Sequence, residues 1–239
     1  MGSTRESLKV KLFADGADLA GMIEMASKPY ISGLTTNPTL MKKAGITDYV
    51  KFAKDVLAEI QDKPISFEVF SDELAGMKKQ GEKIASWGEN VYVKVPVTNT
   101  RGESTNSVIQ HLSSCGVKVN VTALMTTSQV QQVMDVLNPE IESCVSVFAG
   151  RIADTGRDPV GIISDSLKIL SENHKAQLIW ASPRELLNVF QANQIGCHII
   201  TATNDILKKL DLVDYDLSAY SLDTVKMFYN DALEAGFSF

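Results

Sequence analysis

The stretch VYVKVPV, residues 91–97, decides the fold class. Its valines and tyrosine are typical of a strand that is buried on both faces, as strands of a parallel sheet are. Lys94 nevertheless lies at its centre. A charge inside a buried strand is costly unless the residue is paired or takes part in chemistry. The stretch therefore predicts a parallel strand whose lysine either reaches solvent or has a charge that burial destabilises.

Short apolar runs of the same kind recur along the chain, separated by segments with helical periodicity. The predicted strands are 9–15, 30–37, 65–70, 91–97, 117–123, 144–150, 176–182 and 197–203. Strands that alternate with helices predict a parallel sheet, and eight such units in 239 residues favour a closed (β/α)8 TIM barrel over an open sheet. No linker interrupts the pattern. We expect one TIM-barrel domain over 1–239, with residues 1–8 as a flexible start.

Composition narrows the functional classes. Lys and Arg number 23 against 29 Asp and Glu, a net charge of −6 that does not suggest nucleic-acid binding. The three cysteines and three histidines show neither disulfide nor metal-ligand spacing, and no GxGxxG follows the first strand. We therefore expect no metal and no cofactor. Without a signal peptide or a membrane-length apolar run, a cytoplasmic protein with no membrane partner is expected.

Polar residues gather at the predicted carboxyl ends of the strands, where the chemistry of a barrel lies. They are Asp15, Thr35, Asn37, Glu68, Lys94, Asn120, Thr122, Arg151, Ser182, Arg184, Thr201 and Thr203. Each has a structural alternative: Asp15 could cap a helix, Asn37 could shape a turn, and the two arginines could face solvent. Glu68 and Lys94 could form a structural ion pair. Their convergence on one end of the barrel favours an active site.

Seven motifs follow one another along the chain: FAD (13–15), GLTTNPTL (33–40), FEVF (67–70), VYVKVPVT (91–98), NVTALMT (120–126), FAGRIADTG (148–156) and WASPREL (180–186). This series resembles the transaldolase family, and more narrowly its short-chain branch, which also contains fructose-6-phosphate aldolases. The resemblance extends from about Lys9 to the C-terminal helix. It implies metal-free aldol chemistry on sugar phosphates in a TIM barrel.

The resemblance also implies catalytic roles. Lys94, whose burial favours the neutral and nucleophilic amine, would form a Schiff base with a ketose. Asp15 would act as general acid and base at the C4 hydroxyl. Glu68 and Thr122 would hold and activate the water that enters and leaves with the Schiff base. Two carboxylates in different surroundings can divide such tasks.

The matching binding residues fall into two groups. Thr35, Asn37 and Asn120 would bind the three-carbon fragment. Arg151, Ser182 and Arg184 would clamp the phosphate, since guanidinium groups hold phosphate in a bidentate manner. Trp180 and Pro183 depart from the usual sequence beside Ser182 and place the acceptor's chain length and phosphate affinity in question.

Phe148 favours group transfer over cleavage. The aldolase branch carries a tyrosine at this position, whose hydroxyl assists protonation of the released enamine, and phenylalanine cannot donate that proton. The expected function is a transaldolase that moves a dihydroxyacetone unit from sedoheptulose 7-phosphate or fructose 6-phosphate to an aldose phosphate. The alternatives are a fructose-6-phosphate or dihydroxyacetone aldolase, a phosphosugar lyase or isomerase without an imine, and a non-catalytic barrel.

The segment 218–236 predicts an amphipathic helix that is followed by Phe237 and Phe239. It could cover the barrel. Short-branch relatives assemble into rings through such a helix, so the resemblance implies a homo-oligomer, for example a pentamer or a decamer.

Overall fold

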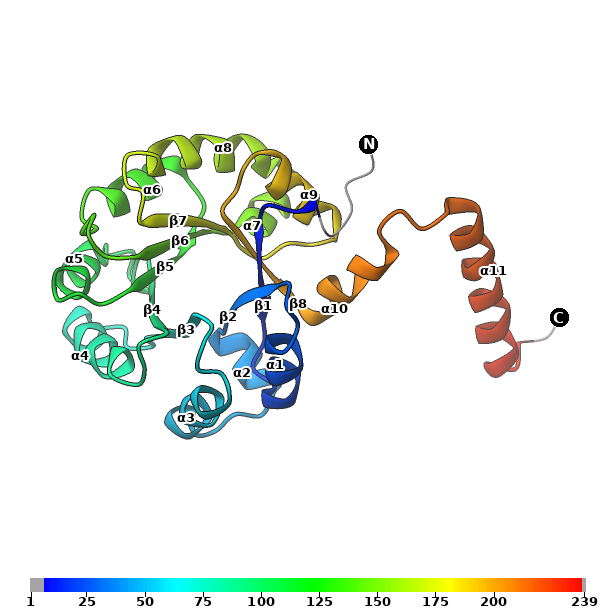
Figure 1. Ribbon diagram of the computed structural model, residues 1–239, viewed down its shortest axis with the longest axis horizontal. Coiled ribbons are helices and arrows are strands. Elements are labelled where there is room, and N and C mark those ends of the chain that lie inside the picture. The colour runs from blue at the N-terminus through cyan, green and yellow to red at the C-terminus, as the bar shows by residue number, and fades with distance from the viewer. Residues whose placement is uncertain (1–6, 238–239) are drawn as a thin grey trace.

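The computed structural model describes residues 7–237, and its eight parallel strands close into a barrel surrounded by helices (Figure 1). The strands are β1 (Lys11–Asp15), β2 (Ile31–Thr35), β3 (Ile65–Glu68), β4 (Val91–Pro96), β5 (Val119–Leu124), β6 (Ser143–Val147), β7 (Ala176–Trp180) and β8 (Ile199–Thr203). β1 pairs with β8 and closes the barrel. The predicted TIM barrel is confirmed, and each of the eight predicted strand segments overlaps one strand of the structure.

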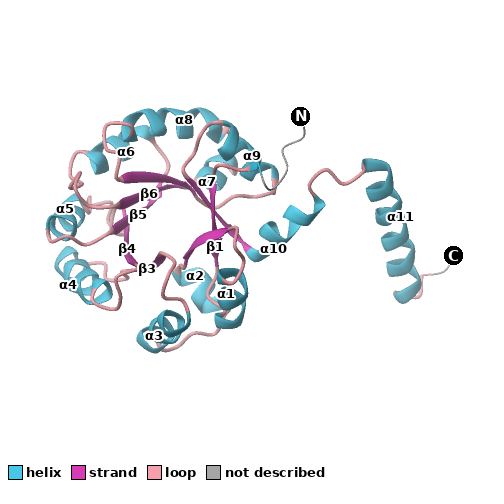
Figure 2. Cartoon of the chain, in the orientation of Figure 1, coloured by secondary structure: helices cyan, strands magenta, loops and turns pink. Residues whose placement is uncertain are grey.

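Helices follow the strands in sequence and form the outer layer (Figure 2). They are α1 (Leu19–Ala26), α2 (Pro38–Lys43), α3 (Tyr49–Glu59), α4 (Leu74–Ala85), α5 (Asn106–Ser114), α6 (Thr127–Met134), α7 (Ala149–Ala153), α8 (Pro159–Leu170), α9 (Leu187–Gln194), α10 (Asn204–Leu207), the 3-10 helix η2 (Lys208–Leu212) and α11 (Leu217–Glu234). Asp158 caps α8 by accepting from the Val160 amide at 2.9 Å, and Pro159 takes its first position.

The predicted strand 144–150 extends too far. β6 ends at Val147, and α7 begins at Ala149. Residues 144–150 are mostly apolar and buried, and a short apolar run does not distinguish a strand from a buried helix. The early helix matters for the site, because it brings Arg151 back toward the barrel.

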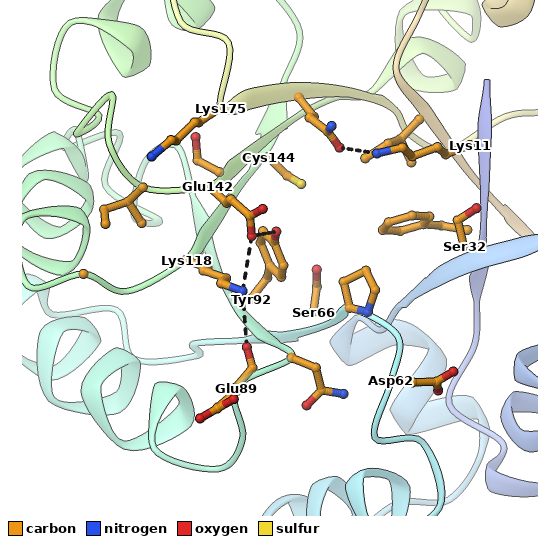
Figure 3. Close-up of a pocket in the computed structure, with 18 of the residues that line it drawn as sticks. Lys11, Ser32, Asp62, Ser66, Glu89, Tyr92, Lys118, Glu142, Cys144 and Lys175 are labelled. Carbon is orange, nitrogen blue, oxygen red and sulfur yellow. Dashed lines mark hydrogen bonds and ion pairs between the residues drawn. The ribbon is translucent and has the colours of Figure 1, made fainter. Parts of the chain in front are cut away.

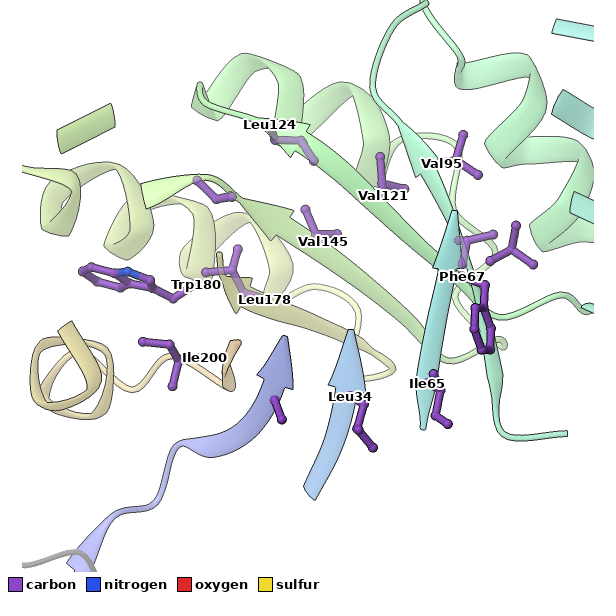
Figure 4. Packing of buried hydrophobic residues seen from close by; sticks show 14 of the residues in the cluster. Leu34, Ile65, Phe67, Val95, Val121, Leu124, Val145, Leu178, Trp180 and Ile200 are labelled. Carbon is purple, nitrogen blue, oxygen red and sulfur yellow. The ribbon is translucent and has the colours of Figure 1, made fainter. Parts of the chain in front are cut away.

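Alternate strand residues point outward and pack beneath the helices (Figure 4). On β5 these are Val119, Val121 and Leu124, all fully buried. Burial of each such side chain contributes about 1.5–3 kcal/mol relative to exposure. The outer layer thus provides the apolar core, and the inner face of the strands is free to carry polar residues.

A small apolar cluster fills the middle of the barrel interior. Phe13, Cys144, Ile179 and Ile199 meet there, with Tyr92 and Phe148 packed against them. Gly33 is required beside this cluster, since a Cβ at residue 33 would lie 2.5 Å from the Phe13 ring. The cluster lies between one cavity at the amino ends of the strands and another at the carboxyl ends.

The C-terminal helix α11 stands away from the barrel, beyond α10 and η2 (Figure 1). None of its residues is buried, so it does not cover the barrel of its own chain. Gly236, at φ 69°, follows its end, as expected of a helix C-terminus.

Residues 1–6, most of the start that we expect to be flexible, lie outside the described residues, so that expectation stays a prediction. Leu8 packs against the core. Within residues 7–237, no helix combines the length and the apolar character that a membrane crossing needs.

Candidate active site

A cavity of about 600 Å³ opens at the carboxyl ends of the strands. Ten of the eleven predicted site residues line it: Asp15, Thr35, Asn37, Glu68, Lys94, Thr122, Phe148, Arg151, Ser182 and Arg184. The strand-end positions explain this convergence, because parallel strands in a barrel end on the same face.

Lys94 lies on the floor of this cavity with its side chain 8% exposed. Its Nζ lies 3.2 Å from Oε2 of Glu68, the residue opposite it on β3. It also donates to the Thr36 carbonyl at 3.0 Å. An ammonium group has three donors, so these contacts fix two directions and leave a third for a substrate.

Asp15 accepts hydrogen bonds from two neighbours on the β2 side. Thr35 Oγ1 donates to Oδ1 at 2.8 Å, and Asn37 Nδ2 donates to Oδ2 at 3.3 Å. Burial raises the pKa of Asp15 above its usual 3.8, although the Lys94 charge and these hydrogen bonds act in the opposite direction. A carboxyl whose pKa is raised holds a proton more readily, which suits a group that takes up and returns protons.

The helix-cap alternative for Asp15 is wrong, because Asp18 caps α1 by accepting from the Gly21 amide at 2.8 Å. Asn37 caps a helix instead of only shaping a turn, and its contact with a substrate stays a prediction. Its Oδ1 accepts from the Leu40 amide at 3.0 Å and caps α2, while its Nδ2 faces Asp15.

Thr122 is 2% exposed, and its hydroxyl has no hydrogen-bond partner among the described residues. The register of β5 against β6 shifts between Val121 and Leu124, and Ala123 adopts φ 65°. A residue other than glycine pays about 1–2 kcal/mol for this left-handed conformation. An unsatisfied buried hydroxyl costs a further 1–3 kcal/mol or so, which a ligand in the cavity could recover. Such local cost is typical of functional sites.

Asn120 lies beneath the cavity and is fully buried. Its Nδ2 donates to Ser66 Oγ at 2.9 Å, and its Oδ1 accepts from Ser146 Oγ at 2.7 Å. Ser66 faces the amino-end cavity and Ser146 the carboxyl-end cavity. In this structure Asn120 therefore orients Ser146, and its contact with a substrate stays a prediction.

Arg151 and Arg184 are exposed, as the solvent-facing alternative supposed, yet both line the rim of the cavity. Arg184 contacts Asp154 and donates from Nη1 to Ser182 Oγ at 3.0 Å. Ser182 adopts φ 59°, and its carbonyl oxygen would lie 1.6 Å from a Cβ at residue 150. Gly150 therefore allows the start of α7 to pack directly on the end of β7.

The cavity has further polar lining residues that have no predicted role: Thr39, Ser146, Thr201, Thr203 and Asp205. Of these, Thr201 and Thr203 are already among the polar residues at the predicted strand ends. Thr201 contacts Thr35 through the two hydroxyl oxygens at 2.5 Å. The period of two along 144–147 could have indicated Ser146, because it places this residue on the same face as Cys144.

A larger cavity of about 880 Å³ lies at the amino ends of the strands (Figure 3). Its charged groups largely satisfy one another: Lys118 pairs with Glu142 at 3.2 Å, and Lys175 with Glu140 at 3.4 Å. Tyr92 donates to Glu142 at 3.2 Å. Because barrel chemistry lies at the carboxyl ends of the strands, we assign the candidate active site to the smaller cavity.

Among residues 7–237 no group of three or more His, Cys, Asp or Glu side chains is placed to hold a metal ion. The cavity instead combines a buried amine, two carboxylates, hydroxyl groups and two guanidinium groups. Such a set can bind an anionic substrate and move protons around a nucleophilic amine.

Fold and site together define a TIM-barrel enzyme with a lysine at its centre. The chain belongs to the Transaldolase/Fructose-6-phosphate aldolase family, whose model matches residues 12–237. It is 32% identical over 218 residues to a protein named "Probable transaldolase" from Sulfurihydrogenibium sp., covering 90% of this chain and 96% of that one. A protein of the same name from Methanococcus maripaludis is 33% identical over 202 residues, covering 84% and 89%.

Solved structures with low sequence identity share the fold. A HpcH/Hpal aldolase/citrate lyase family protein from Burkholderia cenocepacia has a TM-score of 0.59 at 11% identity, covering 95% of this chain and 100% of that one. N-acetylneuraminate lyase from Mycoplasma synoviae has a TM-score of 0.51 at 11% identity, covering 94% and 82%. These likenesses support the barrel architecture.

Proposed function

We propose that the protein is a transaldolase, which transfers a dihydroxyacetone unit from a ketose phosphate to an aldose phosphate through a Schiff base on Lys94. Sedoheptulose 7-phosphate and fructose 6-phosphate are the proposed donors. The observation that carries the proposal is the buried Lys94 amine, held 3.2 Å from Glu68 on the floor of a cavity with two arginines at its rim. The names of the relatives agree with it.

The first chemical step needs a neutral amine. Glu68 is close enough to take a proton from the Lys94 ammonium, after which the amine attacks the C2 carbonyl of the ketose. The carbinolamine then loses water to give the iminium. Thr122 has a free hydroxyl with which to bind that water, and Glu68 returns the proton to it.

The second step breaks the bond between C3 and C4. Asp15 takes the proton of the C4 hydroxyl, the electron pair of the C–C bond moves into the iminium, and an aldose phosphate leaves. The enamine stays on Lys94. The raised pKa of Asp15, which burial causes, suits a group that takes up this proton and later returns it.

The enamine must next react with an acceptor aldose. Phe148 lines the cavity and offers no proton to the enamine carbon. An enamine that is not protonated persists on Lys94 until it reacts with the carbonyl group of an acceptor aldose. The result is transfer of the three-carbon unit. The alternative, cleavage to free dihydroxyacetone, would need a proton donor in the position of this ring.

Borohydride reduction tests the Schiff base. The protein is incubated with fructose 6-phosphate, reduced, digested and analysed by mass spectrometry. We expect a reduced sugar adduct on the peptide that contains Lys94. Lys94→Arg should lose both the adduct and the activity, because a guanidinium group does not form an imine, whereas the control Lys11→Arg in the amino-end cavity should keep both. An active protein without an adduct would support a lyase or isomerase that does not use an imine.

We also propose that α11 joins copies of this chain into a homo-oligomer. The helix has no buried residue, and Leu217, Leu222, Val225, Phe228 and Leu233 are each more than half exposed. A continuous apolar surface of this kind on a helix is typical of an interface between subunits. The C-terminal helix of a second copy is the proposed partner.

A further inference from the structure

The side chain of Arg184 is held by a partner that lies outside the cavity wall. Its Nε donates to Asp154 Oδ1 at 2.8 Å, and its Nη2 donates to Asp154 Oδ2. Its Nη1 donates to Ser182 Oγ at 3.0 Å. Asp154 itself does not line the cavity.

These contacts determine which donors remain. A guanidinium group has five N–H donors, and three are used: Nε–H, one on Nη2 and one on Nη1. The remaining two lie one on each terminal nitrogen, Nη1 and Nη2, and this terminal edge can present them to phosphate oxygens. Because Ser182 accepts from Arg184, its own hydroxyl proton is free to point elsewhere and serve as a third donor.

The backbone fixes this arrangement from both sides. Asp154 follows the last residue of α7, and its amide donates to the Gly150 carbonyl at 2.9 Å. The guanidinium carbon of Arg184 lies 3.2 Å from where a Cβ at residue 150 would be. α7 therefore carries Arg151, the glycine on which Arg184 lies, and the carboxylate that orients it.

We infer that Asp154 is a positioning residue that aims the terminal edge of Arg184 at the phosphate of the substrate and thereby sets the preference for phosphorylated aldoses. This rests on the proposed function, which supplies the substrate. Hydrogen bonds from Arg184, together with its charge and that of Arg151, hold the pKa of Asp154 below its usual 3.8. The carboxylate is therefore ionised at neutral pH.

Three variants test the inference. Asp154→Asn keeps the shape but replaces one acceptor with a donor that opposes the guanidinium group. Asp154→Glu keeps the charge. Asp165→Asn is the control: it removes a carboxylate of similar exposure from an ion pair with Lys168 on α8, and neither residue lines the cavity.

Two measurements are made on each protein. The first is the Kd of inorganic phosphate by calorimetry. The second is the ratio of kcat/KM for glyceraldehyde 3-phosphate to that for glyceraldehyde as acceptor. We expect Asp154→Asn to weaken phosphate binding and lower the ratio, each about tenfold, the effect of losing one charge-assisted contact. Asp154→Glu should give intermediate values, and the control should match the wild type.

A merely structural role has a different signature. If Asp154→Asn lowers the melting temperature but leaves both the phosphate Kd and the acceptor ratio unchanged, the inference is wrong. It is also wrong if the wild type does not bind phosphate. Phosphate binding needs no turnover, so a failure of borohydride trapping at Lys94 would contradict the proposed function while the phosphate Kd still decided the role of Asp154.

Discussion

Nζ of Lys94 lies 3.2 Å from Oε2 of Glu68, directly across the pairing of β4 with β3. Removing one partner of a buried ion pair costs about 3–5 kcal/mol, but replacing both with apolar residues is often neutral or stabilising. Stability alone is thus a weak reason for this pair. The proposed Schiff-base chemistry gives a better one, because it needs a group within reach of the Lys94 amine that can take up a proton, and Glu68 lies there.

Thr122→Val tests whether the free hydroxyl serves chemistry. Valine has nearly the shape of threonine, and the hydroxyl of Thr122 makes no hydrogen bond to a described residue. We expect the rate of iminium formation to fall about 100-fold, the lower range for a lost proton-transfer group. The free energy of unfolding should rise by about 1 kcal/mol, since an unsatisfied buried group is removed. Rapid-quench borohydride trapping and denaturant unfolding measure the two effects.

Thr105→Val is the matched control for this variant. Thr105 is equally buried, but its hydroxyl donates to the Pro96 carbonyl at 2.5 Å. Its loss should lower stability and leave iminium formation nearly unchanged. If Thr122→Val also destabilises the protein without slowing the iminium step, the hydroxyl has only a packing role.

Phe148→Tyr tests the choice between transfer and cleavage. The ring lines the cavity and packs against the apolar cluster inside the barrel, so a hydroxyl added to it would introduce a proton donor near the enamine. We expect the release of free dihydroxyacetone from fructose 6-phosphate to rise at least tenfold relative to transfer, an order of magnitude typical of a modest proton donor. An enzymatic assay of dihydroxyacetone with and without acceptor measures this. An unchanged ratio would show that another group controls protonation.

Sequence patterns identify the charged residues inside the barrel strands better than they place residues along the barrel axis. Lys94 stands out in 91–97 because its neighbours are valines, and Glu68 is found in the same way in 65–70. Barrel strands are staggered, so an in-register row runs from Glu68 through Lys94 and Asn120 to Cys144 at the amino-end cavity. A one-dimensional pattern carries no stagger, which is why Asn120 is expected at the cavity surface and is found below it.

Contacts between side chains that are distant in sequence are harder still to predict from sequence patterns. Asp154 and Arg184 are 30 positions apart, and their contact depends on Gly150 and on the left-handed Ser182. Neither feature has a local sequence signal strong enough to predict the two hydrogen bonds between the Arg184 and Asp154 side chains. For α11 the amphipathic pattern predicts the helix, but the pattern does not say which surface covers its apolar residues.

Asp15→Asn should change how stability depends on pH. Burial raises the pKa of Asp15 in the folded protein, so between pH 3.8 and this raised pKa the folded state binds more protons than the unfolded state, and stability falls as pH rises through that range. Asp15→Asn does not lose stability in this way, because asparagine does not ionise. Its melting temperature should approach that of the wild type near pH 4, exceed it increasingly as pH rises toward the folded-state pKa of Asp15, and keep a constant advantage above it, by about 2–4 °C for each kcal/mol.

Thermal unfolding from pH 4 to pH 7 checks this expectation, with the exposed Asp165→Asn as control. A variant that is less stable than the wild type at pH 7 would show that the Lys94 charge and the Thr35 and Asn37 hydrogen bonds outweigh the burial of the carboxylate. The same variant should lose C3–C4 cleavage and still form the iminium, which separates the role of Asp15 from that of Lys94.

The exposed face of α11 gives the last prediction. Val225 and Phe228 are 60% and 64% exposed in the single chain. If a second copy covers them, the wild type should elute from a sizing column with light scattering as an oligomer, and the double variant Val225→Glu, Phe228→Glu as a monomer, because buried charges without partners are costly. Asn230→Glu adds one charge to the same helix at an already polar position and should stay oligomeric. A monomeric wild type, or an unchanged oligomer in the double variant, would contradict the role of this helix.

Since α11 contributes no buried residue to the barrel, the monomeric variant should keep the far-UV circular dichroism of a folded barrel.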